Sequence, residues 1–133
     1  TTWRGRLPAG EQYRIRLFAP STSANYRLSV RMPIEIEFDP GATAANIVGM
    51  VAAERSVDYV LRGRVGQEVS IAVASPSAGV HLVVEGMEDD APLLSLDEGA
   101  TEWEETLPTT QDYLIRVMAS EQDATYALDI SVN

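Results

Sequence analysis

Residues 13–17 read Tyr-Arg-Ile-Arg-Leu and residues 113–117 read Tyr-Leu-Ile-Arg-Val, two related stretches that lie one hundred positions apart. In the first of them apolar and polar side chains alternate, which is the pattern of a β-strand with one face against a core. The same alternation recurs at residues 26–30 and 34–38, and turn-forming residues such as Asp-Pro-Gly at 39–41 follow it. The local pattern therefore predicts a chain of short strands.

The remainder of the sequence continues this pattern. Short apolar or alternating runs bounded by turns predict further strands at about 45–52, 57–65, 68–75, 81–86, 92–96, 101–107, 112–119 and 125–132. The one helix-compatible stretch, 48–55, is rich in Ala but contains Gly49 and lies between predicted strands. Many short strands at even spacing favour a sandwich or barrel of antiparallel strands, so we predict an all-β fold.

An internal repeat with an offset of 100 residues organises the chain. The matching pairs are Trp3 with Trp103, Leu7-Pro8 with Leu107-Pro108, Tyr13 with Tyr113, Ile15-Arg16 with Ile115-Arg116, Ala19 with Ala119, Tyr26 with Tyr126 and Leu28 with Leu128. Residues 1–33 thus match the C-terminal third of a unit that spans 34–133. We predict a tandem module, in which 1–33 contributes three strands of a first copy truncated at its N-terminus and 34–133 is a complete sandwich.

Composition excludes several classes of chemistry. The chain of 133 residues is 45% apolar and carries a net charge of −10, with no Cys, no Lys and a single His, His81. Disulfides, thiolate nucleophiles and most zinc or His-based schemes are therefore excluded, and we predict neither an enzyme nor a bound cofactor. The net charge disfavours nucleic acid. No apolar run approaches the roughly 18–20 residues that a membrane span needs.

The charge is divided sharply at the repeat boundary. Residues 1–33 hold six arginines and one acid, for a net charge of +5, whereas 34–133 hold four arginines and nineteen acids, for a net charge of −15. Strand alternation puts the six arginines on the side opposite the apolar residues, so they are expected to share one face of one small sheet. These arginines are Arg4, Arg6, Arg14, Arg16, Arg27 and Arg31.

Three strands alone bury too little surface to be stable, so this basic fragment is expected to dock on an acidic partner. The carboxylates predicted to receive it are Glu35, Glu37, Asp39, Glu102, Glu104 and Glu105. The partner is either a second copy, which gives a head-to-tail oligomer or filament, or a neighbouring part of the same protein. The first functional hypothesis is therefore a non-catalytic module that assembles through strand and charge complementarity.

Several segments of the complete unit resemble a known bacterial family. They are Phe38-Asp-Pro-Gly-Ala-Thr43, Val57–Leu61, Gly66–Ile71, Gly99–Trp103, Leu107–Tyr113 and Tyr126–Ile130. They are similar to the pre-peptidase C-terminal-like domain, and also to the periplasmic inhibitors of g-type lysozyme. The resemblance implies a jelly-roll β-sandwich in an extracellular, cell-surface or periplasmic protein. For the pre-peptidase C-terminal-like family it implies an accessory module of a secreted enzyme.

The inhibitor resemblance is carried by Asp112, Tyr113, Arg116 and Val117, which match an Asp-Tyr-x-x-Arg-Val stretch of that family. It implies a second functional hypothesis, inhibition of a g-type lysozyme through the loop that follows the stretch. That loop, 118–123, is acidic here whereas the family's is basic, and Gln111 replaces a Gly.

Two further binding hypotheses come from the second unit. Some pre-peptidase C-terminal-like domains bind Ca²⁺, and acidic clusters at 85–90 and 97–105 could supply its oxygen ligands, although acidic turns are commonly only solvated and no Asp-x-Asp-x-Asp-Gly loop occurs. The aromatic residues Trp103, Tyr113 and Tyr126 could bind a polysaccharide, or they could pack in the core. His81 begins an apolar run and is expected to be a strand-end residue.

Overall fold

A computed structural model describes residues 3, 5, 7 and 10–133, which fall into two compact units, Thr1–Met32 and Pro33–Asn133. The strands of the second unit are β1 (Ile34–Glu35), β2 (Ala44–Val51), β3 (Ser56–Gly63), β4 (Glu68–Ala74), β5 (Val80–Gly86), β6 (Pro92–Leu94), β7 (Glu102–Thr106), β8 (Gln111–Ala119) and β9 (Ala124–Val132). A single 3-10 turn, η1 (Leu96–Glu98), lies between β6 and β7. Within the described residues, no helix is long and apolar enough to span a membrane.

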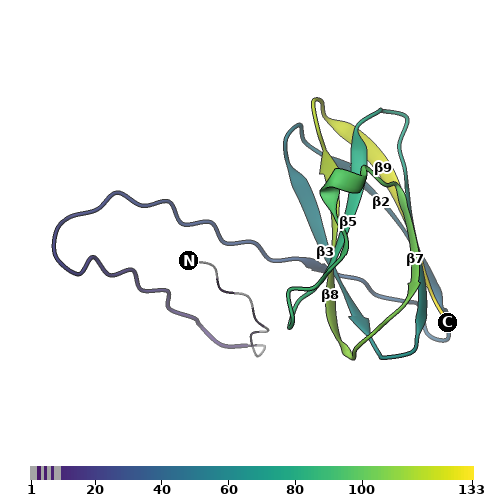
Figure 1. Ribbon diagram of the computed structural model, residues 1–133, viewed down its shortest axis with the longest axis horizontal. Coiled ribbons are helices and arrows are strands. Elements are labelled where there is room, and N and C mark those ends of the chain that lie inside the picture. Colours follow the sequence, from purple (N-terminus) through teal and green to yellow (C-terminus); the bar gives the residue numbers. More distant parts are fainter. Residues whose placement is uncertain (1–2, 4, 6, 8–9) are drawn as a thin grey trace. The chain divides into compact units, whose positions relative to one another are not determined.

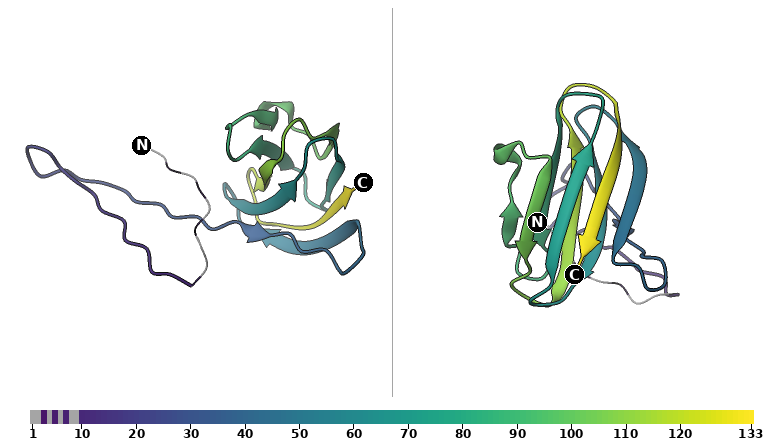
Figure 2. Two further views of the ribbon diagram at one scale, coloured as in Figure 1. Left: turned by 90° about the horizontal axis from the view of Figure 1, so that it is seen from below. Right: turned by 90° about the vertical axis from the view of Figure 1, so that its right-hand side faces the viewer.

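The strands of the second unit form two sheets that pack face to face (Figures 1 and 2). The large sheet has the order β1-β3-β8-β5-β6, and the small sheet has the order β2-β9-β4-β7. From β2 onward, every connection except β5–β6 crosses from one sheet to the other, which is the strand arrangement of a jelly roll. The predicted all-β sandwich is confirmed.

The strand boundaries follow the sequence pattern closely, with one difference. Each predicted strand from 45–52 onward is present, and its ends agree with the structure to within two residues. The stretch 34–38 is shorter than predicted, because only Ile34 and Glu35 form a strand, and that strand runs parallel to β3. The chain then turns Ile36 into the core, where its side chain is buried and its N–H donates to the Val60 carbonyl at 3.0 Å. The sandwich is therefore mixed at this edge.

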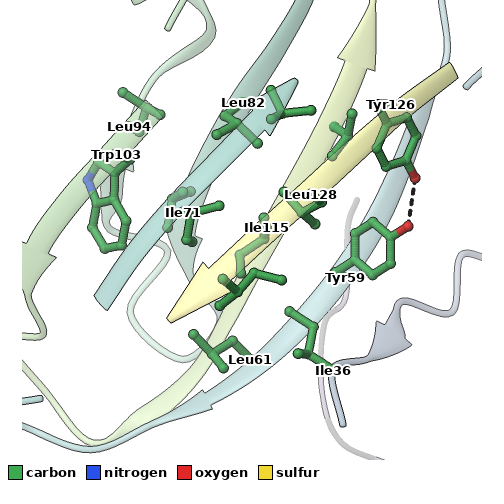
Figure 3. Packing of buried hydrophobic residues seen from close by; sticks show 14 of the residues in the cluster. Ile36, Tyr59, Leu61, Ile71, Leu82, Leu94, Trp103, Ile115, Tyr126 and Leu128 are labelled. Atoms are coloured by element: carbon green, nitrogen blue, oxygen red, sulfur yellow. Dashed lines mark hydrogen bonds between the residues drawn. The ribbon is translucent and has the colours of Figure 1, made fainter. Parts of the chain in front are cut away.

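The core lies between the two sheets and is formed by the alternate residues of each strand. Leu82, Ile115 and Leu128 are fully buried at its centre. Figure 3 shows Trp103 near one edge of this core and Ile36 near the other. The alternation read from the sequence thus identifies the inward face of the strands.

A buried pair of tyrosines joins the sheets. The hydroxyl groups of Tyr59 on β3 and Tyr126 on β9 lie 2.6 Å apart and share a hydrogen bond (Figure 3). Gly49 faces Tyr126 across the β2–β9 ladder, and a Cβ at that position would collide with the tyrosine ring. Burial, together with the hydrogen bond to Tyr59, raises the pKa of Tyr126 well above its ordinary value. Tyr126 is therefore neutral in the core at physiological pH.

The last three strands are interleaved with the earlier ones. Strand β7 pairs with β4, β8 lies between β3 and β5, and β9 lies between β2 and β4. No two of these three strands pair with each other. The C-terminal third of the unit therefore obtains its ladder partners from residues 34–100.

The first unit differs from its counterpart in the second. Residues 10–32 carry no strand, although alternation predicts strands at 13–17 and 26–30, and the chain reverses its direction at a bend near residues 20–22 (Figure 1). Because the counterpart strands pair with residues 34–100 and not with one another, a fragment of this kind has no internal sheet to form. The origin of 1–33 as a truncated repeat stays a prediction.

Candidate functional site

Strand β8 carries the Asp-Tyr-x-x-Arg-Val stretch through the middle of the large sheet. Its side chains alternate, so that Tyr113 and Val117 point into the core and are almost wholly buried. Asp112 and Arg116 lie on the outer face and are half-buried. The stretch therefore combines two core residues with two charged residues on one accessible face.

Arg116 is held by carboxylates from both neighbouring strands. Its Nε donates to Oδ1 of Asp58 on β3 at 3.0 Å, and its Nη2 lies 3.8 Å from Oε1 of Glu85 on β5. The pairing across three strands fixes the guanidinium against the sheet. Sequence analysis named Glu85 only as part of an acidic cluster and did not pair Asp58 or Glu85 with Arg116, because both lie far from it in the chain. The available signal was the repeat itself, because an arginine occupies this outward position in both copies.

Gln111, which replaces a Gly of the inhibitor stretch, is a buried polar residue with three partners. Its amide nitrogen donates to Asp89 Oδ2 at 2.9 Å and to Thr109 Oγ1 at 2.7 Å, and its oxygen accepts from the Glu88 N–H at 2.9 Å. These bonds fasten the acidic β5–β6 connection, residues 87–91, to the start of β8. The buried amide group of Gln111 therefore has hydrogen-bond partners for both its nitrogen and its oxygen.

Tyr113 anchors the same end of the strand. Its hydroxyl donates to the Thr109 carbonyl at 2.7 Å, four residues upstream, and its ring packs where Gly63 has no side chain. A tyrosine that bonds back to the preceding connection fixes a corner between two sheets of a sandwich. Its role is therefore structural.

At the far end of β8, three connections that cross between the sheets come together. They are the β2–β3 connection (52–55), the β4–β5 connection (75–79) and the β8–β9 connection (120–123), which we call the loop end. The Asp123 carboxylate accepts from the Ala53 N–H at 2.9 Å, and the Ser120 N–H donates to the Gly79 carbonyl at 3.0 Å. The Ser75 hydroxyl donates to the Thr125 carbonyl at 2.8 Å. The loop end is therefore cross-linked by hydrogen bonds.

The loop end is acidic and contains a strained residue. Glu54 and Glu121 are exposed, and Arg55 is its one basic residue. Glu54 has a φ of 56°, in the left-handed region that side chains other than Gly adopt at some cost. Backbone strain in an accessible turn is often found at functional sites. A preformed acidic surface of this kind suits a partner with a basic surface.

Six arginines are predicted to form one basic face, but the matching positions in the second unit do not all lie in one sheet. Arg4 and Arg6 lie outside the described residues, and Arg14, Arg16, Arg27 and Arg31 are exposed in the first unit. In the complete unit, the counterparts of 11–19 lie in the large sheet and those of 24–32 in the small sheet. Because a jelly roll separates these strands, a first unit folded like its counterpart would divide the arginines between two outer faces.

The six carboxylates predicted to bind the basic fragment likewise do not lie in one patch. Glu35, Glu37 and Asp39 are exposed on and just after β1, at one edge of the large sheet, and Glu102, Glu104 and Glu105 are exposed on β7, at one edge of the small sheet. Strand β1 adjoins β3, whose Tyr59 faces β9, whereas β7 adjoins β4, which packs on β5. The two acidic groups are therefore at opposite sides of the sandwich. Their role in partner binding stays a prediction.

The remaining candidates have structural surroundings. The aromatic side chains Trp103, Tyr113 and Tyr126 are buried in the core, so they do not form a sugar-binding platform. His81 lies on β5, and its Nδ1 is 3.0 Å from the Gly99 carbonyl oxygen. Across residues 3, 5, 7 and 10–133, no three acidic or His side chains converge in a way that could hold a metal ion. Calcium binding stays a prediction.

The chain was compared with known families, curated proteins and solved structures. No family model and no curated protein matches it. Its fold is similar to that of PliG, a periplasmic lysozyme inhibitor of g-type lysozyme, from three organisms. The Aeromonas hydrophila protein has a TM-score of 0.66 and 19% identity, with 76% of this chain and 96% of that one covered. The Salmonella Typhimurium protein has a TM-score of 0.60 and 20% identity, and a mutant of the Escherichia coli protein has a TM-score of 0.59 and 21% identity. Each match covers 76% of this chain and 97% of the other. The chain thus shares the fold of these inhibitors over nearly their whole length.

Proposed function

We propose that the second unit is an inhibitor of a g-type lysozyme, and that the loop end is the surface with which it contacts the enzyme. The observation that carries this proposal is the fold shared with three such inhibitors over 96–97% of their length. The Asp112-Tyr113-x-x-Arg116-Val117 stretch adds support, because it lies on the strand that leads into the loop end. A periplasmic or extracellular location follows from the same proposal.

Inhibition of this kind needs no chemistry from the inhibitor. A rigid protuberance that fits the substrate cleft of an enzyme excludes the substrate, and rigidity reduces the ordering cost of binding. The bonds of Ala53 and Ser120 tie the three connections of the loop end to one another, and that of Ser75 ties the β4–β5 connection to β9, which supports the required rigidity. The ion pairs of Arg116 brace the outer face of the strand that supports it.

The charge of the loop end defines the class of lysozyme surface that it fits. The loop 118–123 is acidic here, so its counterpart on the enzyme should be basic, and the association should weaken as salt is added. This differs from an inhibitor with a basic loop, which would meet an acidic surface. The specificity of this chain for particular g-type lysozymes should follow that charge.

The test is a titration of the chain into a purified g-type lysozyme during the lysis of peptidoglycan, with a c-type lysozyme as the specificity control. We expect lysis by the g-type enzyme to fall to near zero at about equimolar chain, with no effect on the c-type enzyme. Glu121→Arg should weaken inhibition by roughly tenfold, which corresponds to a like-charge contact that costs about 1.4 kcal/mol.

A matched control distinguishes the loop end from the general acidity of the chain. Glu88→Arg makes the same change in charge at the opposite end of β8, on an exposed side chain, and should leave inhibition unchanged. Equal loss in the two variants would assign the effect to net charge. If basic and acidic g-type lysozymes both retained full activity at a tenfold excess of the chain, the proposed function would be wrong.

A further inference from the structure

The apolar residues of the first unit are exposed although their counterparts form the core of the second. Trp3 is 71% exposed and Trp103 is 7% exposed, while Ile15 is 59% and Ile115 is 0% exposed. Leu28 and Leu128 differ in the same way, at 50% and 0%. Large apolar side chains left on the surface in this number indicate a segment that is covered by a partner. The repeat specifies what covers this set, because it shows what covers the counterparts.

Residues 34–100 cover the counterparts. Strand β8 lies between β3 and β5, β9 lies between β2 and β4, and β7 is hydrogen-bonded to β4. All five of these pairings are made to strands from 34–100. A partner for 1–33 must therefore offer the same arrangement of gaps between strands.

A second copy of this chain does not offer it. Each copy has two segments of the C-terminal type, 1–33 and 101–133, but only one segment of the type 34–100. In the structure that segment is already filled by 101–133. If 1–33 of one copy displaced 101–133 of another, as many apolar side chains would be released as were buried, so no apolar surface would be gained.

Charge points to the same kind of partner. Residues 34–100 hold three arginines and twelve acids, for a net charge of −9, and residues 101–133 have a net charge of −6, whereas 1–33 have a net charge of +5. Both acids that hold Arg116, Asp58 and Glu85, belong to 34–100. Arg16 occupies the counterpart position of Arg116. A segment like 34–100 would thus meet 1–33 with opposite charge and with carboxylates placed for Arg16.

We propose that residues 1–33 are the three closing strands of a second jelly-roll sandwich, and that they bind a polypeptide segment with the strand pattern of 34–100. That segment supplies two open gaps in its sheets and carboxylates at the positions of Asp58 and Glu85. On binding it, residues 11–19 join one sheet and 24–32 the other. The outward arginines are then divided between the two outer faces, with Arg14 and Arg16 on the large sheet and Arg27 and Arg31 on the small one.

The test joins a copy of residues 34–100 in front of Thr1 of the full chain, so that Ala100 meets Thr1 as it meets Thr101 in the natural sequence. Trp103→Phe leaves Trp3 as the only tryptophan, because 34–100 contain none. We expect acrylamide quenching of Trp3 to fall to the level measured for Trp103 in a Trp3→Phe chain without the extension. Without the extension, Trp3 should be quenched freely.

Two variants of the extended chain separate specific strand insertion from collapse. Ile15→Glu places a charge at a position whose counterpart is fully buried, and it should restore free quenching of Trp3. Gln12→Glu makes the same change in charge at an outward position of the same strand, whose counterpart is the half-buried carboxylate Asp112, and should leave Trp3 protected. Protection in both variants, or in neither, would overturn the proposal.

Two other results would also overturn it. The first is that quenching of Trp3 is the same in the extended chain as in the unextended one. If the extended chain precipitates, the same comparison is made after the 1–133 chain is refolded with a separate 34–100 polypeptide. The second is protection of Trp3 in the unextended chain together with a doubling of mass as its concentration rises, since the partner would then be a second copy.

Discussion

Residues 1–33 and 101–133 share one pattern of apolar and polar side chains, but the described residues of the first segment differ in structure from their counterparts in the second. Ile115 and Leu128 lie in a packed core, whereas Ile15 and Leu28 are exposed, although the identical side chains occupy matching positions. The difference shows that alternation specifies which face of a strand turns inward but does not by itself make a strand. Ladder partners decide that, and in a jelly roll they come from distant parts of the chain.

The largest effect expected from this comparison is on the free energy of unfolding. Ile115→Ala should destabilise the second unit by about 3 kcal/mol, because it leaves a cavity in a fully buried site. Ile15→Ala should change the stability by less than about 0.5 kcal/mol, since exposed positions contribute little. Urea unfolding followed by circular dichroism measures both. Similar losses in the two variants would mean that the first unit is packed as tightly as the second.

A smaller effect is expected at the tyrosines of the repeat. Tyr126→Phe removes one hydroxyl of a buried hydrogen-bonded pair and leaves that of Tyr59 without this partner, which should cost about 1–2 kcal/mol. Tyr26→Phe, at an exposed position, should be neutral to within about 0.5 kcal/mol. The same unfolding measurement compares them, and an equal cost would contradict the difference in burial.

The same pair adds a pH dependence. Burial raises the pKa of Tyr126 in the folded state, so above about pH 10 the unfolded chain releases a proton that the folded chain keeps. The contribution of the protonated Tyr126 to the free energy of unfolding is therefore complete below about pH 10 and is lost as the pH rises further. Unfolding midpoints between pH 8 and 11 should therefore fall less steeply for Tyr126→Phe than for the unmodified chain. If the midpoints of the two chains fell equally with pH, Tyr126 would not be the source of the pH dependence.

Much of the fold could be predicted from local sequence. Turns and alternation located strands β2 to β9 to within two residues, because these signals are encoded in neighbouring side chains. Local sequence could not predict the parallel pairing of β1 with β3 or the absence of strands in 10–32, because both depend on which distant segments are available as partners. The single arginine face rests on one sheet, whereas the counterpart strands β8 and β9 lie in different sheets, so that face stays a prediction.

The candidate site was only partly readable. Asp112, Tyr113, Arg116 and Val117 were recognised as a stretch, and alternation separates the inward Tyr113 from the outward Arg116, but the ion-pair partners of Arg116 carry no local signal. Of the loop end, only the connection that follows β8 was singled out, because the other two connections lie far from it in the chain. Spatial convergence of this kind is set by topology, and a single sequence contains no signal for it.

Amide hydrogen exchange across the unmodified chain tests most directly whether the two copies of the repeat differ in structure. Amides of 111–119 and 124–132 should be protected up to the stability of the whole second unit, because both strands are central in their sheets. Amides of 11–19 and 24–32 should exchange rapidly by comparison. Equal protection of the matching segments would contradict the difference and would mean that the first unit already has its ladder partners.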